Sequence, residues 1–219
     1  MNVLAIGAHP DDIEIGAGGA IALHRMRGDA VTFLLLTSGS EIADSERRKQ
    51  EATAAADVLG VEDVRFLGFQ DTQVPYGSEA VKRIESHVQE TEPDRIYIHT
   101  EEDTHQDHRK SSLGAIAATR NSNEVLAYES PSTRSSFAPQ YFVPFTESVL
   151  EKKIEAIETH ESQSTKQYLE ADAMRGLARF RGQQASSKYA ESFQVIRIVD
   201  KLDESVELPQ FQESRVERH

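Results

Sequence analysis

The sequence predicts an α/β fold: a Rossmann-like, mostly parallel sheet flanked by helices, with a C-terminal extension of helices and an edge strand. Two observations support this prediction. Short apolar runs alternate with helical stretches over the first 128 residues, which is the order of β–α–β units. The first two runs, NVLAIG and VTFLLL, are almost continuously apolar, as in parallel strands that are buried on both faces.

The alternation resolves into five strands and four helices. The strands are expected at residues 2–7, 31–36, 63–68, 95–99 and 124–128. The helices are expected at residues 16–28, 45–59, 78–91 and 108–120. Asp44 or Ser45 caps the second helix, and Gly28, Gly60 and Pro93 follow the last turns of three helices, in agreement with the usual start and stop signals. Because parallel strands need crossover connections, helices should cover both faces of the sheet.

After Tyr128 the alternation stops. Residues 129–145 hold three of the seven prolines and several serines, so we expect a long loop that rims the ligand pocket. Two helical stretches, near 146–161 and 165–181, and a final edge strand at 193–199 follow. We expect one domain over residues 1–200 and a polar, acidic tail over 201–219.

Composition excludes several classes of function. The 219 residues include no cysteine, so a disulfide framework, a thiolate metal site and a cysteine nucleophile are excluded. A net charge of −13 argues against nucleic acid and against an anionic membrane surface as partners. No stretch approaches the roughly 20 apolar residues of a membrane-spanning helix, and the N-terminus lacks a signal-peptide pattern. We therefore expect a cytoplasmic protein.

Two polar clusters follow predicted strands. Residues 8–12 (AHPDD) come after the first strand and residues 105–108 (HQDH) after the fourth. In a doubly wound sheet, ligands bind beyond the carboxyl ends of the strands, at the point where the strand order reverses. In the commonest order the first and fourth strands are neighbours there. The two clusters, almost a hundred residues apart, should therefore meet in one crevice.

The residue types in these clusters fit a metal site. His9 and Asp12 lie three residues apart on a turn, and His108 could supply a third protein ligand. Two histidines and one carboxylate with an open position form a pattern of catalytic zinc. The same donors also suit ferrous iron, so the metal is not fixed by the donor set.

The remaining cluster residues could move protons. Asp11 adjoins the ligand Asp12 and could take a proton from a metal-activated water. His105 could act as an acid or stabilise an oxyanion, with Asp107 placed to orient it and hold it charged. Each residue alone has a simpler interpretation as a helix cap or a surface side chain. A joint position at two neighbouring strand ends favours the catalytic interpretation.

The glycines at residues 16–19 (GAGG) resemble a dinucleotide-binding loop only in part. Ile21 stands where the fingerprint needs its last glycine, and the run comes some nine residues after the strand. We expect these glycines to let the helix pack closely on the sheet. A nucleotide-binding module and a metallophosphoesterase remain alternatives, although a two-metal site would usually need more than three ligands.

These motifs resemble the PIG-L/LmbE-like de-N-acetylase family. The HPDD segment, followed by Glu14 and the glycines, resembles the family signature, and HQDH resembles its His-x-Asp-His motif, with Gln106 where the family often has proline. Weaker resemblances cover most of the chain: residues 37–41, Arg48, Glu51, Lys153, residues 160–163 and residues 189–193. The proline-to-glutamine departure is expected to alter the rigidity of that loop.

The resemblance implies a zinc-dependent hydrolase that removes an acyl group, usually acetyl, from an amino sugar or a related small amine, and that forms a homo-oligomer. It implies specific roles: His9, Asp12 and His108 as zinc ligands, Asp11 as general base, His105 as oxyanion stabiliser or acid, and Asp107 as its modulator. Arg48 and Tyr189 match positions that face the substrate pocket in relatives, and Tyr189 could donate a hydrogen bond to the tetrahedral intermediate.

Overall fold

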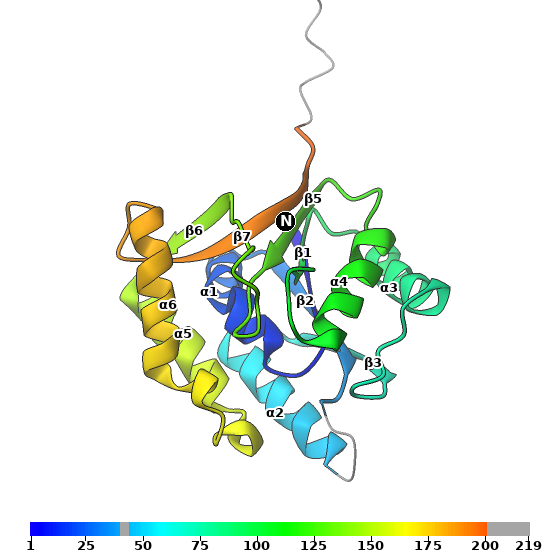
Figure 1. The fold of residues 1–219 in the computed structure, drawn as a ribbon, viewed down its shortest axis with the longest axis horizontal. Helices are drawn as coiled ribbons and strands as arrows, with labels where there is room; N and C mark the ends of the chain where they lie inside the picture. Colours follow the sequence, from blue (N-terminus) through cyan, green and yellow to red (C-terminus); the bar gives the residue numbers. More distant parts are fainter. Residues whose placement is uncertain (40–43, 201–219) are drawn as a thin grey trace, which may run out of the picture.

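The first strand lies inside a seven-stranded sheet, with its neighbours on either side (Figure 1). The computed structural model describes residues 1–39 and 44–200. The sheet has the order β3-β2-β1-β4-β5-β7-β6. Five strands run parallel: β1 (Asn2–Gly7), β2 (Ala30–Thr37), β3 (Asp63–Phe69), β4 (Arg95–His99) and β5 (Glu124–Tyr128). Two antiparallel strands, β7 (Tyr189–Ile198) and β6 (Tyr141–Phe145), extend the sheet. The predicted α/β, mostly parallel fold is confirmed.

Helices cover both faces of the sheet. One face carries α1 (Asp12–Met26), α2 (Ser45–Val58), α5 (Glu147–Glu158) and α6 (Ala171–Gln184). The other face carries α3 (Ser78–Thr91) and α4 (Gln106–Ala118). Alternate residues of β1 enter the two cores, Val3 and Ala5 on one side and Leu4 and Ile6 on the other. This double burial explains why the strand is apolar throughout.

The strand order reverses between β1 and β4. β1 pairs with β2 on one side (Val3 opposite Val31) and with β4 on the other (Ala5 opposite Tyr97). The segments that follow β1 and β4 therefore leave the same edge of the sheet side by side, as the topology argument predicted.

Several element boundaries differ from the prediction. The predicted loop at 129–145 contains β6, which ends the sheet; Pro144 is tolerated there because an edge strand leaves one row of backbone N–H groups unpaired. The final strand begins at Tyr189 instead of residue 193, and it lies between β5 and β6 instead of at the predicted edge, which β6 occupies. Two short 3₁₀ turns, at Glu161–Gln163 and Gln167–Leu169, precede α6. Residues 40–43, which include part of the 37–41 motif, and the tail at 201–219 lie outside the described residues.

The helix α1 begins at Asp12, four residues earlier than predicted, so the glycines lie inside it. A Cβ at Gly16 would overlap the ring of Tyr128, and one at Gly19 would lie 2.6 Å from the ring of Phe145. The expectation of close packing is confirmed, and the glycines at residues 16–19 lie in a helix and not in a loop that could hold a dinucleotide. None of the helices within the two described ranges is long and apolar enough to cross a membrane.

Candidate active site

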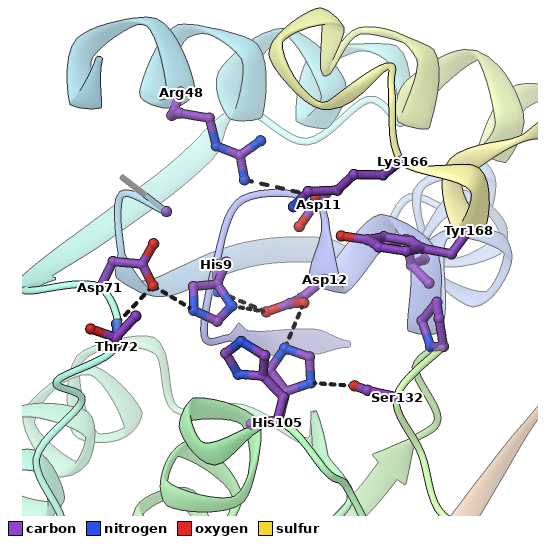
Figure 2. Close-up of a pocket in the computed structure, with 14 residues that line it drawn as sticks. His9, Asp11, Asp12, Arg48, Asp71, Thr72, His105, Ser132, Lys166 and Tyr168 are labelled. Carbon is purple, nitrogen blue, oxygen red and sulfur yellow. Dashed lines mark hydrogen bonds and ion pairs between the residues drawn. The ribbon is translucent and has the colours of Figure 1, made fainter. Parts of the chain in front are cut away.

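A pocket of about 330 Å³ opens at the carboxyl ends of β1 and β4 (Figure 2). Its size lies within the range of small-molecule sites. The walls come from both polar clusters and from further segments of the chain. The lining residues are His9, Asp11, Asp12, Ile15, Gly39, Arg48, Asp71, Thr72, His105, His108, Pro131, Ser132, Lys166 and Tyr168. The predicted convergence of AHPDD and HQDH in one crevice is confirmed.

Asp12 lies between two imidazoles. One carboxylate oxygen, Oδ2, lies 3.4 Å from His9 Nδ1, and the other, Oδ1, lies 3.2 Å from His108 Nε2. Two sets of side chains that include His108 are close enough to bind one ion, because the ligand atoms in each lie within 4.8 Å of one another. The first set is His9, His105 and His108, and the second is Asp12, His99 and His108. The three sequence-predicted ligands are thus adjacent, because Asp12 contacts both histidines, but each of these two sets contains only two of the three.

Two carboxylates that the sequence analysis did not single out orient these imidazoles. Asp103 Oδ2 lies 3.0 Å from His108 Nδ1, and it also accepts a hydrogen bond from Ser130 Oγ at 2.6 Å. Asp71 Oδ1 lies 3.0 Å from His9 Nε2. Each imidazole therefore has one nitrogen held by a carboxylate and the other directed at Asp12, an arrangement that fixes ring orientation in metal sites. Asp103 follows the end of β4, and Asp71 follows the end of β3. This position after a strand was the signal in the sequence that could have identified them.

The charge balance of this cluster favours a cation. Burial lowers the pKa of His108, but the charge of Asp12 and the hydrogen bond to Asp103 outweigh it and raise the pKa to about 9. Burial is likewise outweighed at His9, where hydrogen bonds to surrounding carboxylates raise the pKa well above its ordinary value. Burial opposes ionisation of Asp12, yet the neighbouring histidines hold its pKa well below the usual range. Without a metal, protons on His9 and His108 balance the negative charge of the surrounding carboxylates. A divalent cation would supply this positive charge instead, so the donor set fits a metal.

His99, the last residue of β4, is a further histidine of the cluster. It is fully buried, and its Nε2 lies 3.0 Å from Asp12 Oδ2 and accepts the Ala8 N–H at 3.3 Å. Its ring stacks on that of His108 with centroids 4.1 Å apart. Burial, and then the charge of His108, lower the pKa of His99 to about 4, so this histidine is neutral near pH 7.

Asp11 occupies a constrained position beside the ligands. It precedes α1 with a φ of 100°, a conformation that non-glycine residues adopt only when the surroundings impose it. Its Oδ2 is buried without a hydrogen-bond partner and lies 3.7 Å from Arg48 Nη2. Burial, and then the charge of Asp12, raise the pKa of Asp11 to about 6. A carboxyl of this pKa is ionised at neutral pH and still basic enough to take a proton.

The second cluster differs from the prediction in one respect. Asp107 does not hold the His105 ring through its carboxylate: Asp107 Oδ2 lies 3.4 Å from His9 Nε2, and only the Asp107 backbone N–H bonds His105, at Nδ1. Burial, and then the charge of His108, lower the pKa of His105, so Asp107 does not keep it charged. Since Nδ1 of His105 accepts a hydrogen bond, its Nε2 carries the proton.

The two predicted substrate residues have different positions. Arg48 lines the pocket, and its Nη2 donates to the Pro10 carbonyl at 2.7 Å. Tyr189 does not line it; this residue begins β7 and packs half-buried against the apolar core. Instead Tyr168, which the sequence analysis did not single out, directs its hydroxyl toward the Asp11 side of the pocket, with Lys166 beside it (Figure 2). A role for Tyr189 at the substrate therefore has no support from its position.

Comparisons with known proteins agree with this geometry. Residues 4–119 match the family model described as PIG-L: GlcNAc-PI de-N-acetylase. The chain is 32% identical to YaiS, an uncharacterized deacetylase of Escherichia coli, over 73% of this chain and 90% of that protein. It is 31% identical to a diacetylchitobiose deacetylase of Thermococcus kodakarensis, over 89% and 82%. A solved structure, the hydratase GalB of Pseudomonas putida, superposes with a TM-score of 0.78 at 26% identity, over 93% of this chain and 100% of that one.

The alternatives weighed from the sequence find no match among these proteins. The glycines that favoured a nucleotide-binding module lie within α1, and neither deacetylase relative is named as a phosphoesterase. The family model covers more than half of the chain, and two relatives at more than 30% identity cover most of it. The chain therefore belongs to the PIG-L family of de-N-acetylases.

Proposed function

We propose that this protein is a metal-dependent N-deacetylase that releases acetate from an N-acetylated amino sugar or glycoconjugate. One observation carries the proposal: Asp11, a buried carboxyl of pKa about 6, adjoins the cluster of His9, Asp12 and His108 in a pocket of suitable size. The name of the Thermococcus relative, a diacetylchitobiose deacetylase, supports the class of substrate.

The proposed metal ligands are His9, Asp12 and His108, with Zn²⁺ as the ion or another divalent ion such as Fe²⁺. When bound, such an ion polarises the acyl oxygen and lowers the pKa of water toward neutrality. Imidazole and carboxylate donors fit both ions. Asp103 and Asp71, which contact the outward nitrogens of His108 and His9, would hold the ligand rings in place.

Two residues would move protons or stabilise charge. Asp11 takes a proton from the attacking water, since its carboxylate is buried and basic and its Oδ2 has no hydrogen-bond partner. His105 is neutral with its proton on Nε2, so it donates a hydrogen bond to the oxygen that becomes negative in the tetrahedral intermediate. Protonated Asp11 then returns its proton to the leaving nitrogen, which releases a free amine and acetate.

The substrate would lie between Arg48 and the pair formed by Lys166 and Tyr168. Arg48 lines the pocket, and a guanidinium N–H can donate to a sugar hydroxyl. The ring of Tyr168 offers an apolar surface for a sugar ring. Asp107 Oδ2 lies 3.4 Å from His9 Nε2, and the proposed role of this carboxylate is to orient His9 as a metal ligand.

The test is a screen of N-acetylglucosamine, diacetylchitobiose and other N-acetylated amino-sugar conjugates. Release of equal amounts of acetate and free amine, lost with a chelator and restored by Zn²⁺ or Fe²⁺, would support the proposal. Because the GalB structure is that of a 4-carboxy-2-hydroxymuconate hydratase, an unsaturated tricarboxylate is included. Hydration of that compound with no amide hydrolysis would overturn the proposal. The single domain, the homo-oligomer and the cytoplasmic location remain predictions, to be checked by light scattering and cell fractionation.

A further inference from the structure

A buried ion pair meets the backbone of α1 behind the pocket. Lys153 of α5 and Glu191 of β7 are both almost fully buried, and Lys153 Nζ lies 2.6 Å from Glu191 Oε1. Neither residue belongs to the pocket wall or has a role in the proposed chemistry. A charged pair at such depth is costly unless further hydrogen bonds satisfy it, so its remaining partners indicate its purpose.

Those remaining partners are backbone groups inside a helix. Lys153 Nζ donates to the carbonyl of Ile15 at 2.7 Å. The two oxygens of Glu191 accept the N–H groups of Gly19 and Ala20, each at 2.8 Å. In a regular α-helix the N–H of residue 19 donates to the carbonyl of residue 15. Both members of that backbone pair are thus hydrogen-bonded by the ion pair.

The glycines of α1 make this approach possible. A Cβ at Gly18 would lie only 3.1 Å from Cγ of Lys153, and one at Gly19 would meet the ring of Phe145. The sequence run GAGG therefore has a second role beyond close packing on the sheet: it leaves room for the lysine stem to reach the Ile15 carbonyl.

From Ile15 the contact continues to the active site. The Ile15 N–H donates to the carbonyl of Asp11 at 3.0 Å, and Ile15 itself lines the pocket. One residue thus joins the ion pair, through its carbonyl, to the turn that carries Asp11 and Asp12, through its N–H.

We propose that Lys153 and Glu191 are positioning residues: their ion pair, hydrogen-bonded to the backbone of α1, fixes the turn of residues 11–15 so that Asp12 is oriented toward the metal and Asp11 toward the attacking water. The inference rests on the proposed function for the metal at Asp12, but the pair itself is defined by its backbone contacts. It makes the site depend on α5 and β7, two elements that supply no lining residue to the pocket.

The test compares Glu191→Gln and Lys153→Met with the wild type, all free of metal at the start. Two readouts are used: hydrogen exchange of peptides covering residues 13–22, and the affinity for Zn²⁺ in competition with a chromogenic chelator. We expect exchange at residues 13–22 to rise tenfold or more while peptides of β2 and α3 keep their rates. We expect Zn²⁺ affinity to fall about 10- to 100-fold, as for outer residues that orient metal ligands.

A control variant separates positioning from general loss of stability. Glu124→Gln removes the partner of Arg95, an ion pair of 2.7 Å at the opposite end of the sheet. This variant should lower the melting temperature without changing Zn²⁺ affinity or exchange at residues 13–22.

A double variant, Lys153→Met with Glu191→Leu, distinguishes backbone capping from simple charge pairing. Replacing a buried ion pair by apolar side chains often restores stability. The apolar side chains, however, cannot hydrogen-bond the carbonyl of Ile15 or the N–H of Gly19. The proposal therefore expects Zn²⁺ affinity to stay low in the double variant. Wild-type affinity in a folded Glu191→Gln or double variant, with unchanged exchange at residues 13–22, would overturn it. A wild type that binds neither Zn²⁺ nor Fe²⁺ would instead overturn the proposed function, and the exchange readout would still decide the role of the pair.

Discussion

Asp103 holds His108 from behind: its Oδ2 lies 3.0 Å from Nδ1 of the imidazole, whose Nε2 faces Asp12. The carboxylate fixes the tautomer in which Nε2 is free for a metal. Asp103→Asn should keep the fold and lower Zn²⁺ affinity about 10- to 100-fold. Chelator competition measures this. Asp94→Asn, at the far end of the sheet where it accepts the Asn2 N–H, is the control; equal losses in both variants would contradict the assignment.

Asp11→Asn should retain the metal but lower the rate about 10²- to 10⁴-fold, since a general base contributes that much. Elemental analysis and acetate release are measured on the same sample. The amide keeps the size of the side chain but cannot take a proton. A variant as fast as the wild type on a competent substrate would remove Asp11 from this role.

His108 should make the stability of the metal-free protein depend on pH. Its pKa is raised from 6.5 to about 9, so its contribution to stability is complete below pH 6.5 and is lost as the pH rises through 9. Chemical unfolding of the chelator-treated wild type and His108→Gln at pH 6 and pH 9.5 should give a difference that shrinks at the higher pH. With Zn²⁺ the trend reverses, because a metal binds deprotonated histidine.

Tyr168→Ala should raise KM about tenfold with a smaller change in kcat, which corresponds to roughly 1.4 kcal/mol of lost binding. Tyr189→Ala is the informative comparison, because Tyr189 does not line the pocket. It should leave KM unchanged at a temperature well below its unfolding transition. A rise in KM for Tyr189→Ala alone would reverse our interpretation of the two tyrosines.

Gly16→Ala should destabilise the protein by about 1–3 kcal/mol, because its Cβ would force the ring of Tyr128 out of a packed core. Gly176→Ala is the matched control within α6, where a Cβ would meet no atom within 4 Å. That change should stabilise the protein by roughly 0.5–1 kcal/mol, since alanine favours a helix over glycine. Thermal unfolding of both variants compares the two effects.

The sequence was informative wherever a physical rule linked the position of a residue in the chain to its location in the fold. His9 and His108 could be brought together in advance because β1 and β4 flank the point where the strand order reverses. The same rule applies to Asp71, Asp103 and His99, which also follow or end strands, but single polar residues there carried no recognisable motif.

Other features depend on packing that a sequence pattern does not contain. Lys166 and Tyr168 reach the pocket from a 3₁₀ segment whose course is set by the docking of α5 and α6. The sequence of β6 has no alternating pattern and includes Pro144, so it resembles a loop. It forms a strand because it pairs with the edge of β7. The contact of Asp107 with His9 instead of His105 is decided by a side-chain rotation that residue order does not encode.

The ion pair between α5 and β7 also bears on how the protein is made. Glu191 leaves the ribosome about 180 residues after Asp12, which is a delay of roughly 10–40 s at ordinary rates of synthesis. During that interval β1, β2 and β3 can pair, but α1 lacks the side chains that brace its first turn. The proposed metal site would therefore be braced only after Glu191 has been synthesised, well after its proposed ligands His9, Asp12 and His108.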